Sequence, residues 1–233
     1  MKCPPVIETE TARLKALGEY GLGSDRPLPS LDPVVQIAAR MFSMPMAAIN
    51  MIGSDHVFFA ASVGLENDGV SMSRDVSFCA HAITQNDVMV VADARQDERF
   101  HDNPLVTGPA NLRFYAGVPL VSPDGHALGA LCVLDGKPHD DFSADDCTRL
   151  LELARMAADR LELRRIEIST EQSSRPFEAF AMNSPTAVVC FDANGRIIAW
   201  NDAAARLLGY DLADGKGRAF DTLVAERHGA EVR

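Results

Sequence analysis

Residues 113–135 read RFYAGVPLVSPDGHALGALCVLD, and two apolar runs flank the segment Ser122-Pro123-Asp124-Gly125-His126. Proline fixes φ for a turn, aspartate hydrogen-bonds its own nearby backbone, and glycine accepts a left-handed conformation. The pattern therefore predicts a β-hairpin. Because both faces of the two strands are mostly apolar, we expect the hairpin to be covered on both sides.

Alternation along the two strands divides their side chains between two faces of the hairpin. The pattern places on one face Phe114, Ala116, Val118, Leu120, Leu128, Ala130, Cys132 and Leu134. It places on the other face Tyr115, Gly117, Pro119, Ala127, Leu131 and Val133. Proline donates no ladder hydrogen bond, so we expect Pro119 near a strand end.

Four segments resemble, in order and spacing, the GAF domains at the N-termini of bacterial signalling proteins. They are ETARLKALGEYGL (residues 10–22), RDVSFCAHAI (74–83), NPLVTGPANLRFYAGVPL (103–120) and GHALGALCVLD (125–135). The resemblance implies an α+β fold over residues 1–165, with an antiparallel sheet flanked by helices. It also implies a pocket for a small molecule, and it names no cofactor.

Composition excludes several classes of function. The chain has 233 residues and a net charge of −11, whereas nucleic acids and anionic membranes attract basic surfaces. No apolar run approaches the roughly 18–20 residues of a spanning helix, and no signal-peptide segment opens the chain, so we expect a cytoplasmic protein. The five cysteines are scattered without a CxxC pair, which argues against a zinc knuckle or a disulfide framework.

The residues before the hairpin predict short alternating elements. Helices are expected over residues 9–17, from Ser30 or Asp32 onward with Pro33 in the first turn, and over residues 74–85 with Asp75 or Ser77 as cap. Strands are expected over residues 46–52, 56–63 and 87–93. Residues 66–73 are expected to form a loop, and residues 95–109 a partly ordered segment with a helical turn near residues 98–100.

A long helix is predicted to begin after Ser143, because a serine cap precedes two acidic residues. Its seam is heptad-like and consists of Leu150, Ala154, Ala157, Leu161, Arg164 and Ile168. We expect a homodimer through residues 143–169, with Leu161 and Ile168 covered by the second chain. The alternative is that the helix packs only against its own sheet.

The C-terminal part predicts a second, smaller module. A polar hinge is expected at residues 169–176, followed by strands at 187–192 and 196–201 around the turn Ala193-Asn194-Gly195. A helix is expected to end at Gly209. This segment resembles the opening of a PAS domain, so we assign residues 166–176 to a linker and residues 177–233 to an incomplete PAS module. We expect residues 211–233 to be mobile and the chain to be a fragment of a longer protein.

Candidate pocket residues come from the segments that resemble the GAF family. Asp93 and Arg113 fall at strand ends and could reach the mouth of a cavity, or could instead pair with each other to hold a loop. The apolar and aromatic candidates could form its walls. The full candidate set is Phe78, Cys79, His81, Asp93, Phe100, Leu105, Arg113, Phe114, Tyr115 and Cys132.

Thiol chemistry at Cys79 is the main enzymatic alternative. Cys79 and His81 stand two residues apart, a spacing that points to different helix faces and lacks further metal ligands. Cys79 matches one cysteine of the free methionine-R-sulfoxide reductases, which share the GAF fold. The loops at residues 66–70 and 107–111 lack the resolving cysteine that such chemistry needs. We therefore expect Cys79 to be a small buried residue, and we assign no catalytic residue, no metal site and no bilin chromophore.

The expected function is sensory regulation. A small ligand or a partner would change the GAF domain, and the long helix would carry the change to an absent C-terminal output domain. The family resemblance implies a histidine kinase or an enzyme that makes or hydrolyses cyclic di-GMP as output. Two other functions remain open: a sulfoxide reductase, and a dimerisation scaffold that binds no ligand.

Overall fold

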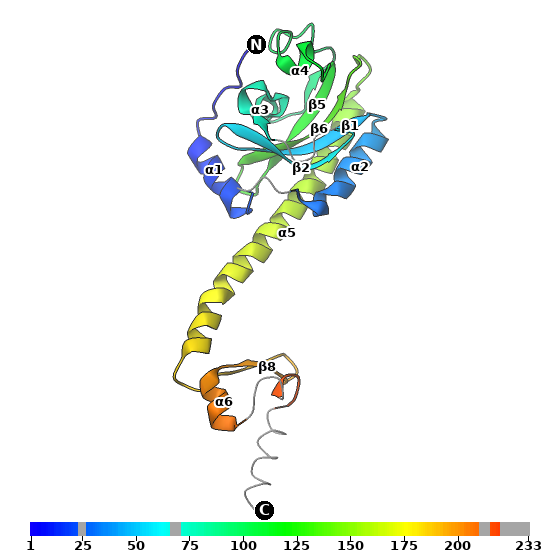
Figure 1. Cartoon of the computed structure of the whole chain (residues 1–233). Helices are drawn as coiled ribbons and strands as arrows, with labels where there is room; N and C mark the ends of the chain where they lie inside the picture. The colour runs from blue at the N-terminus through cyan, green and yellow to red at the C-terminus, as the bar shows by residue number, and fades with distance from the viewer. Residues whose placement is uncertain (23–26, 66–70, 210–214, 220–233) are drawn as a thin grey trace, which may run out of the picture. The chain divides into compact units, whose positions relative to one another are not determined.

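The computed structural model describes residues 1–22, 27–65, 71–209 and 215–219, with the backbone alone for residues 171–181. The chain divides into two compact units, Met1–Ile168 and Ser169–Arg233. Figure 1 shows the first unit as a sheet with helices on both faces. Within the described residues, we find no helix with the length and apolar character that crossing a membrane requires.

The first unit is built around a six-stranded antiparallel sheet with the order β3-β2-β1-β6-β5-β4. The strands are β1 (Met46–Ile52), β2 (His56–Val63), β3 (Met72–Ser73), β4 (Met89–Val91), β5 (Phe114–Val121) and β6 (Ala127–Asp135). The predicted hairpin is confirmed as β5–β6, and Gly125 adopts a left-handed φ of 82° in its turn. Strand β3 lies where a loop was predicted, because Met72 and Ser73 pair with the start of β2.

The register of the hairpin corrects the predicted division of faces. Leu120 pairs with Gly129 and Val121 with Ala127, so Leu128 is an extra, bulged residue on β6. The bulge moves the pattern by one position. Side chains that pack on the Phe114 face are Ala116, Val118, Leu120, Leu128, Leu131 and Val133. Those on the Tyr115 face are Ala130, Cys132 and Leu134. The alternation of side chains within one strand can be read from the sequence. Which face of one strand matches which face of the other depends on the bulge, and the sequence pattern does not reveal the bulge.

Pro119 lies inside β5, opposite Ala130, although we expected it near a strand end. The outer neighbour β4 pairs only with residues 115–117. Pro119 therefore sits beyond that short strand, where β5 has a partner on one side only. This position explains how a residue without a backbone donor is accommodated.

Three helices cover the Phe114 face of the sheet. They are α1 (Glu10–Glu19), α2 (Asp32–Met41) and α5 (Ala144–Asn183), and their apolar residues form one core with the strands. A short turn of 3-10 helix, η1 (Pro29–Leu31), precedes α2. Thr9 and Leu31 occupy the N-cap positions of α1 and α2, and neither makes a side-chain capping hydrogen bond.

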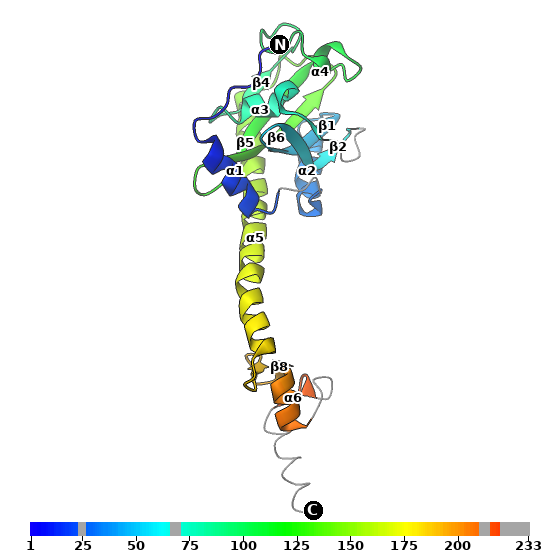
Figure 2. The ribbon, with the colours of Figure 1, turned by 60° about the vertical axis from the view of Figure 1, so that its left-hand side comes forward.

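The opposite, Tyr115 face is covered by shorter elements. They are η2 (Arg74–Val76), α3 (Phe78–Ala82) and α4 (Pro104–Thr107), and Figures 1 and 2 show α3 and α5 on opposite sides of the sheet. The expected helix over residues 74–85 is therefore split and shorter. Ser77 caps α3 by accepting a hydrogen bond from the Ala80 amide, as predicted. Asn103 caps α4, a helix that the sequence pattern did not indicate.

Helix α5 corrects two expectations. Its backbone is continuous from Ala144 to Asn183, so residues 169–176 are helical rather than a hinge. Four of the six predicted seam residues pack into their own domain, with exposed fractions of 4% or less: Leu150, Ala154, Ala157 and Leu161. Arg164 donates to the backbone oxygen of Tyr20, which explains a charge in that seam. A second chain therefore does not cover Leu161.

The second unit contains a small hairpin and a helix, as predicted. Its elements are β7 (Val189–Phe191), β8 (Ile197–Trp200) and α6 (Asp202–Leu208). The Asn201 side chain accepts from Ala204 to cap α6 and donates to the carbonyls of Ser184 and Thr186, and Gly209 ends the helix with φ 76°. The expectation for residues 211–233 falls outside the described residues, apart from residues 215–219.

Candidate functional site

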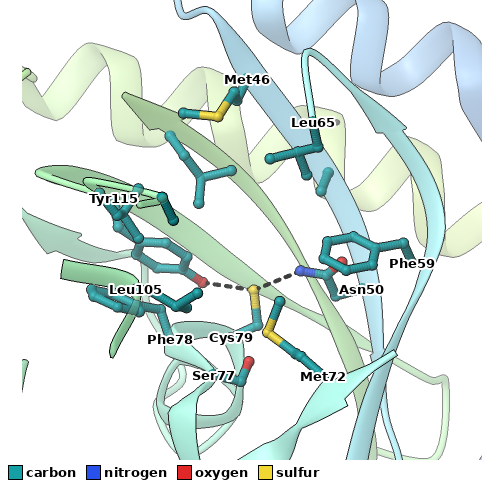
Figure 3. A pocket seen from close by; sticks show the side chains of 14 residues that line it. Met46, Asn50, Phe59, Leu65, Met72, Ser77, Phe78, Cys79, Leu105 and Tyr115 are labelled. Atoms are coloured by element: carbon teal, nitrogen blue, oxygen red, sulfur yellow. Dashed lines mark hydrogen bonds between the residues drawn. The ribbon is translucent and has the colours of Figure 1, made fainter. Parts of the chain in front are cut away.

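A cavity of about 110 Å³ opens on the Tyr115 face of the sheet. Figure 3 shows side chains from the central strands, from α3 and from the loop around α4 converging on it. The lining residues are Met46, Ala48, Asn50, Phe59, Leu65, Met72, Ser77, Phe78, Cys79, Leu105, Ala110, Leu112, Tyr115 and Leu134. Most are apolar, and none of the described lining residues carries a formal charge.

The polar groups of the cavity gather around one sulfur atom. The Asn50 Nδ2 donates to Cys79 Sγ over 3.0 Å, and the Tyr115 hydroxyl donates to the same sulfur over 3.3 Å (Figure 3). Ser77 caps α3 and thereby fixes the first turn, which holds Cys79 over the strands. Three elements, β1, α3 and β5, thus supply one hydrogen-bonded group.

Asn50 is the unusual member of this group. Its side chain is 4% exposed, and its Oδ1 finds no hydrogen-bond partner among the residues that the structure describes. A buried acceptor without a partner costs free energy unless a donor fills the space beside it. Because Asn50 also lines the cavity, a residue with an unpartnered acceptor forms part of its wall.

Cys132 of β6 lies directly behind Cys79. The two sulfur atoms are 3.6 Å apart, and the Cys132 thiol also lies 3.6 Å from the Ala48 carbonyl. Hydrogen bonding with Cys132 lowers the pKa of Cys79, helped by Tyr115 and Asn50 and opposed by burial. The same neighbour, together with burial, raises the pKa of Cys132. Burial also raises the pKa of Tyr115, which keeps its hydroxyl protonated as a donor.

The structure brings part of the predicted site together. Four of the predicted residues line the cavity: Phe78, Cys79, Leu105 and Tyr115. Cys132 does not line it, but its sulfur lies 3.6 Å from that of Cys79. Phe100 stacks on the outer side of Phe78 at 3.8 Å between ring centroids, so it supports the wall without lining it.

Four predicted residues lie away from the cavity. Phe114 packs on the opposite face of the sheet, against Phe142. His81 bonds the Lys2 carbonyl at 3.1 Å. The other two are Asp93 and Arg113.

The proposed pairing of Asp93 with Arg113 is wrong. Asp93 accepts from the guanidinium of Arg95 at 2.7 Å, and this partner holds the pKa of the Asp93 carboxyl well below its usual range. Arg113 instead donates to the carbonyls of Val106 and Leu112 at 2.8 and 2.9 Å. Each side chain closes its own local turn, and neither reaches the mouth of the cavity.

Sequence reasoning missed several lining residues, most of them apolar. Asn50 had a detectable signal, because it is the one polar residue in the strand MAAINMI. Cys132 was a candidate, but its proximity to Cys79 was not foreseen. The loops at residues 66–70 and 107–111 contain no cysteine, whereas the thiol beside Cys79 lies on β6. No group of three or more potential metal-binding side chains occurs in the described part of the chain.

Comparison with known proteins defines the class. The sequence profile of the GAF domain matches residues 27–162, more than half of the chain, so the chain belongs to the GAF domain family. The profile of a PAS domain matches residues 177–232.

A curated relative is the cyclic di-GMP phosphodiesterase PA2567 of Pseudomonas aeruginosa. It is 37% identical over 161 residues, which cover 69% of this chain and 27% of the relative. The match thus spans about a quarter of that protein's length.

Two solved structures share the fold at low sequence identity. The free methionine-R-sulfoxide reductase of Neisseria meningitidis, solved with its substrate, is 18% identical with a TM-score of 0.51, covering 72% of this chain and 99% of that one. The GAF domain of a phosphoenolpyruvate-protein phosphotransferase from Coxiella burnetii is 15% identical with a TM-score of 0.51, covering 67% and 95%. At these identities the likeness establishes the fold alone.

Proposed function

We propose that this chain is the sensory part of a cytoplasmic bacterial signalling protein, whose GAF domain binds a small neutral molecule in the cavity beside Cys79. The observation that carries the proposal is a cavity with apolar walls and one buried acceptor, Asn50 Oδ1, that lacks a partner among the described residues. Few convergent polar groups in an apolar pocket are typical of ligand sites.

The lining favours a neutral ligand with one hydrogen-bond donor. The volume of about 110 Å³ is somewhat below that of an engineered cavity of about 150 Å³ that accepts benzene. Burying a charge without a counter-charge is expensive, and the described lining residues provide none. The lining therefore disfavours nucleotides and zwitterionic amino acids, which also weakens the sulfoxide reductase alternative.

Thermal unfolding with small probes tests this proposal. Pyrrole, a neutral ring that is smaller than benzene and has one N–H donor, is expected to raise the Tm of the wild-type chain, while methionine sulfoxide and cyclic GMP leave it unchanged. Leu105→Trp fills the cavity from its half-buried rim and should abolish the pyrrole shift. Met41→Trp adds the same group at an exposed site at the end of α2 and should keep the shift. A pyrrole shift that survives in Leu105→Trp, or no pyrrole shift in wild type, contradicts a neutral-ligand site.

For the full-length protein we propose an output that acts on cyclic di-GMP. The support is the relative named as a cyclic di-GMP phosphodiesterase, which aligns over 69% of this chain. A histidine kinase output is the other candidate. Purified full-length protein should change the cyclic di-GMP concentration in vitro, by hydrolysis or by synthesis from GTP. Absence of both activities, with autophosphorylation from ATP, would favour the kinase.

We also propose that the chain forms a homodimer through the part of α5 within residues 143–169. The large apolar side chains that remain exposed there are Met156, Leu163 and Ile166, at 46%, 62% and 52%. Their spacing of seven and three residues is that of a coiled-coil seam. They replace the original seam, because four of its six residues pack into the GAF core. A second copy is the occupant that suits this stripe, because a parallel pair would place two identical outputs side by side.

Light scattering tests the dimer. Leu163→Glu puts a charge into the exposed stripe and is expected to shift the mass toward that of the monomer. Ser169→Glu adds the same charge about a third of a turn around the helix from Leu163 and should remain dimeric. A wild-type chain that is monomeric at high micromolar concentration, or a Leu163→Glu variant that stays dimeric, would overturn this seam and leave the scaffold alternative unsupported.

A further inference from the structure

Two buried thiols from distant parts of the sequence face each other beneath the cavity. Cys79 on α3 and Cys132 on β6 have exposed fractions of 3% and 0%, and their sulfur atoms are 3.6 Å apart. A disulfide requires a separation of about 2.05 Å, so closure needs a movement of about 1.5 Å. Side-chain rotation of a cysteine can supply much of that distance.

The environment distinguishes the two thiols. Cys79 Sγ accepts hydrogen bonds from Asn50 and Tyr115, and both bonds stabilise a thiolate. Cys132 instead donates to the Ala48 carbonyl, an arrangement that favours the protonated thiol. The hydrogen bond with Cys132, together with Tyr115 and Asn50, lowers the pKa of Cys79, whereas Cys79 and burial raise the pKa of Cys132. Cys79 is therefore the nucleophile of the pair.

The two thiols also differ in their position relative to the cavity. Cys79 lines the cavity, whereas Cys132 is not among its lining residues. A small molecule that occupies this space lies against Cys79. The attacking thiol thus borders the cavity, and the second thiol lies behind it.

We propose that Cys79 and Cys132 form an oxidisable dithiol that reacts with small hydroperoxides such as hydrogen peroxide. The Cys79 thiolate attacks one peroxide oxygen, the O–O bond breaks, and the leaving hydroxide takes a proton to become water. Cys79 is now a sulfenic acid. Cys132 then attacks the Cys79 sulfur, the S–O bond breaks, and the hydroxide leaves with the Cys132 proton as a second water. Two thiols are oxidised to one disulfide, and one peroxide is reduced to two waters.

The reaction would change the floor of the cavity. A disulfide removes the thiolate that Asn50 and Tyr115 stabilise, and it draws the Cys79 sulfur toward β6. The oxidised and reduced domains would thus present different polar surfaces to a ligand. This inference is independent of the proposed neutral ligand, because peroxide need not remain bound.

Mass spectrometry of a simplified chain tests the proposal. Substitution of Cys3, Cys147 and Cys190 by serine leaves only the pair, and the replaced residues lie outside the cavity. After brief treatment with near-stoichiometric hydrogen peroxide, removal of the oxidant and unfolding in the presence of iodoacetamide, we expect a monomer lighter by two hydrogen atoms with neither cysteine alkylated. A disulfide reductant should restore both alkylation sites. Full alkylation after peroxide, or disulfides only between chains, overturns the proposal.

Trapping the intermediate assigns the two roles. In the same background, Cys132→Ser should accumulate a sulfenic acid that dimedone labels at Cys79, while Cys79→Ser should give no label at Cys132. Label at Cys132 in the Cys79→Ser variant would overturn the assignment of Cys79 as nucleophile. Circular dichroism checks that each variant is folded, and if one is not, the mass result on the intact pair decides alone.

Discussion

The two faces of the GAF sheet use alternate residues of the same strands and differ sharply in what they build. On one face, β1 presents Ala47, Ile49 and Met51 to a core with α1, α2 and α5. On the other face the same strand presents Ala48 and Asn50 to the cavity. The first face is closed by the longer helices, and the second by the short elements η2, α3 and α4 and by loops. Packing and binding are therefore separated by the side of the sheet, so substitutions on neighbouring residues should have different consequences.

The largest expected effect compares Leu131 with Leu134 on β6. Leu131 is fully buried in the helix-covered core, while Leu134 lines the cavity and is half-buried. Leu131→Ala should lower the free energy of unfolding by about 3–5 kcal/mol, because a closed core cannot collapse around the missing atoms. Leu134→Ala should cost less than about 2 kcal/mol, since its surroundings already contain space. Urea unfolding measures both, and equal losses would show that the faces are packed alike.

The second prediction concerns Glu10, which holds two arginine side chains at the edge of the helix-covered face. Glu10 on α1 accepts hydrogen bonds from Arg13 at 2.7 Å and Arg74 at 2.5 Å, and Arg13 also donates to the Ile52 carbonyl at the end of β1. Burial alone would raise the pKa of Glu10, but the two guanidinium groups outweigh it and lower the pKa from 4.5 to about 2. Because solvent partly screens this carboxylate, that difference corresponds to less than about 3 kcal/mol of stability.

The sign of the linkage gives a clear pH window. A lowered pKa in the folded state stabilises the fold fully above pH 4.5, and the contribution disappears as the pH falls toward 2. Glu10→Gln should therefore be less stable than wild type at pH 7, and the gap should close in acid. The exposed Glu98→Gln, which removes a surface pair with Lys2, serves as control and should track wild type. A gap that persists unchanged at pH 3 would show that Glu10 acts by packing rather than by charge.

Structural features that depend on neighbouring residues could be predicted from the sequence, and features that depend on distant residues could not. The hairpin turn, the strands at residues 46–52 and 56–63, and the cap Ser77 were predictable, because turn chemistry, alternation and capping are written in neighbouring residues. The bulge at Leu128 was not, and it reversed the facing of half a strand. The pairing of Cys79 with Cys132 depends on a separation of 53 residues, which no local pattern encodes.

The candidate site shows the same limit. Cys79 and Tyr115 were found through motifs, whereas Asn50 was passed over inside an apolar strand. The long helix was predicted, yet its seam was assigned to a second chain because the sequence does not reveal which side of a helix the domain itself covers. Leu161 lies in that covered part, so its substitution by glutamate would disrupt the core instead of testing a dimer.

The smallest expected effect concerns the cavity face and lies in a different pH range. His81 of α3 is 6% exposed, its ring packs edge-on to Phe100 at 4.9 Å, and it bonds the Lys2 carbonyl. Burial lowers the pKa of His81 from 6.5, aided by the charge of Arg99 and opposed by the Lys2 carbonyl and Asp97. The folded state thus prefers the neutral ring, and it loses stability as the pH falls below 6.5, because the unfolded chain binds the proton more readily.

Wild type should show a shallow decline in unfolding free energy just below pH 6.5 that is absent from His81→Gln and retained in the exposed His101→Gln. The decline should be smaller than the Glu10 step, since no buried ion pair is broken. If the unfolding free energy of His81→Gln declines as that of wild type does, another group causes the acid response of this face. The two faces of the sheet would then differ in packing alone.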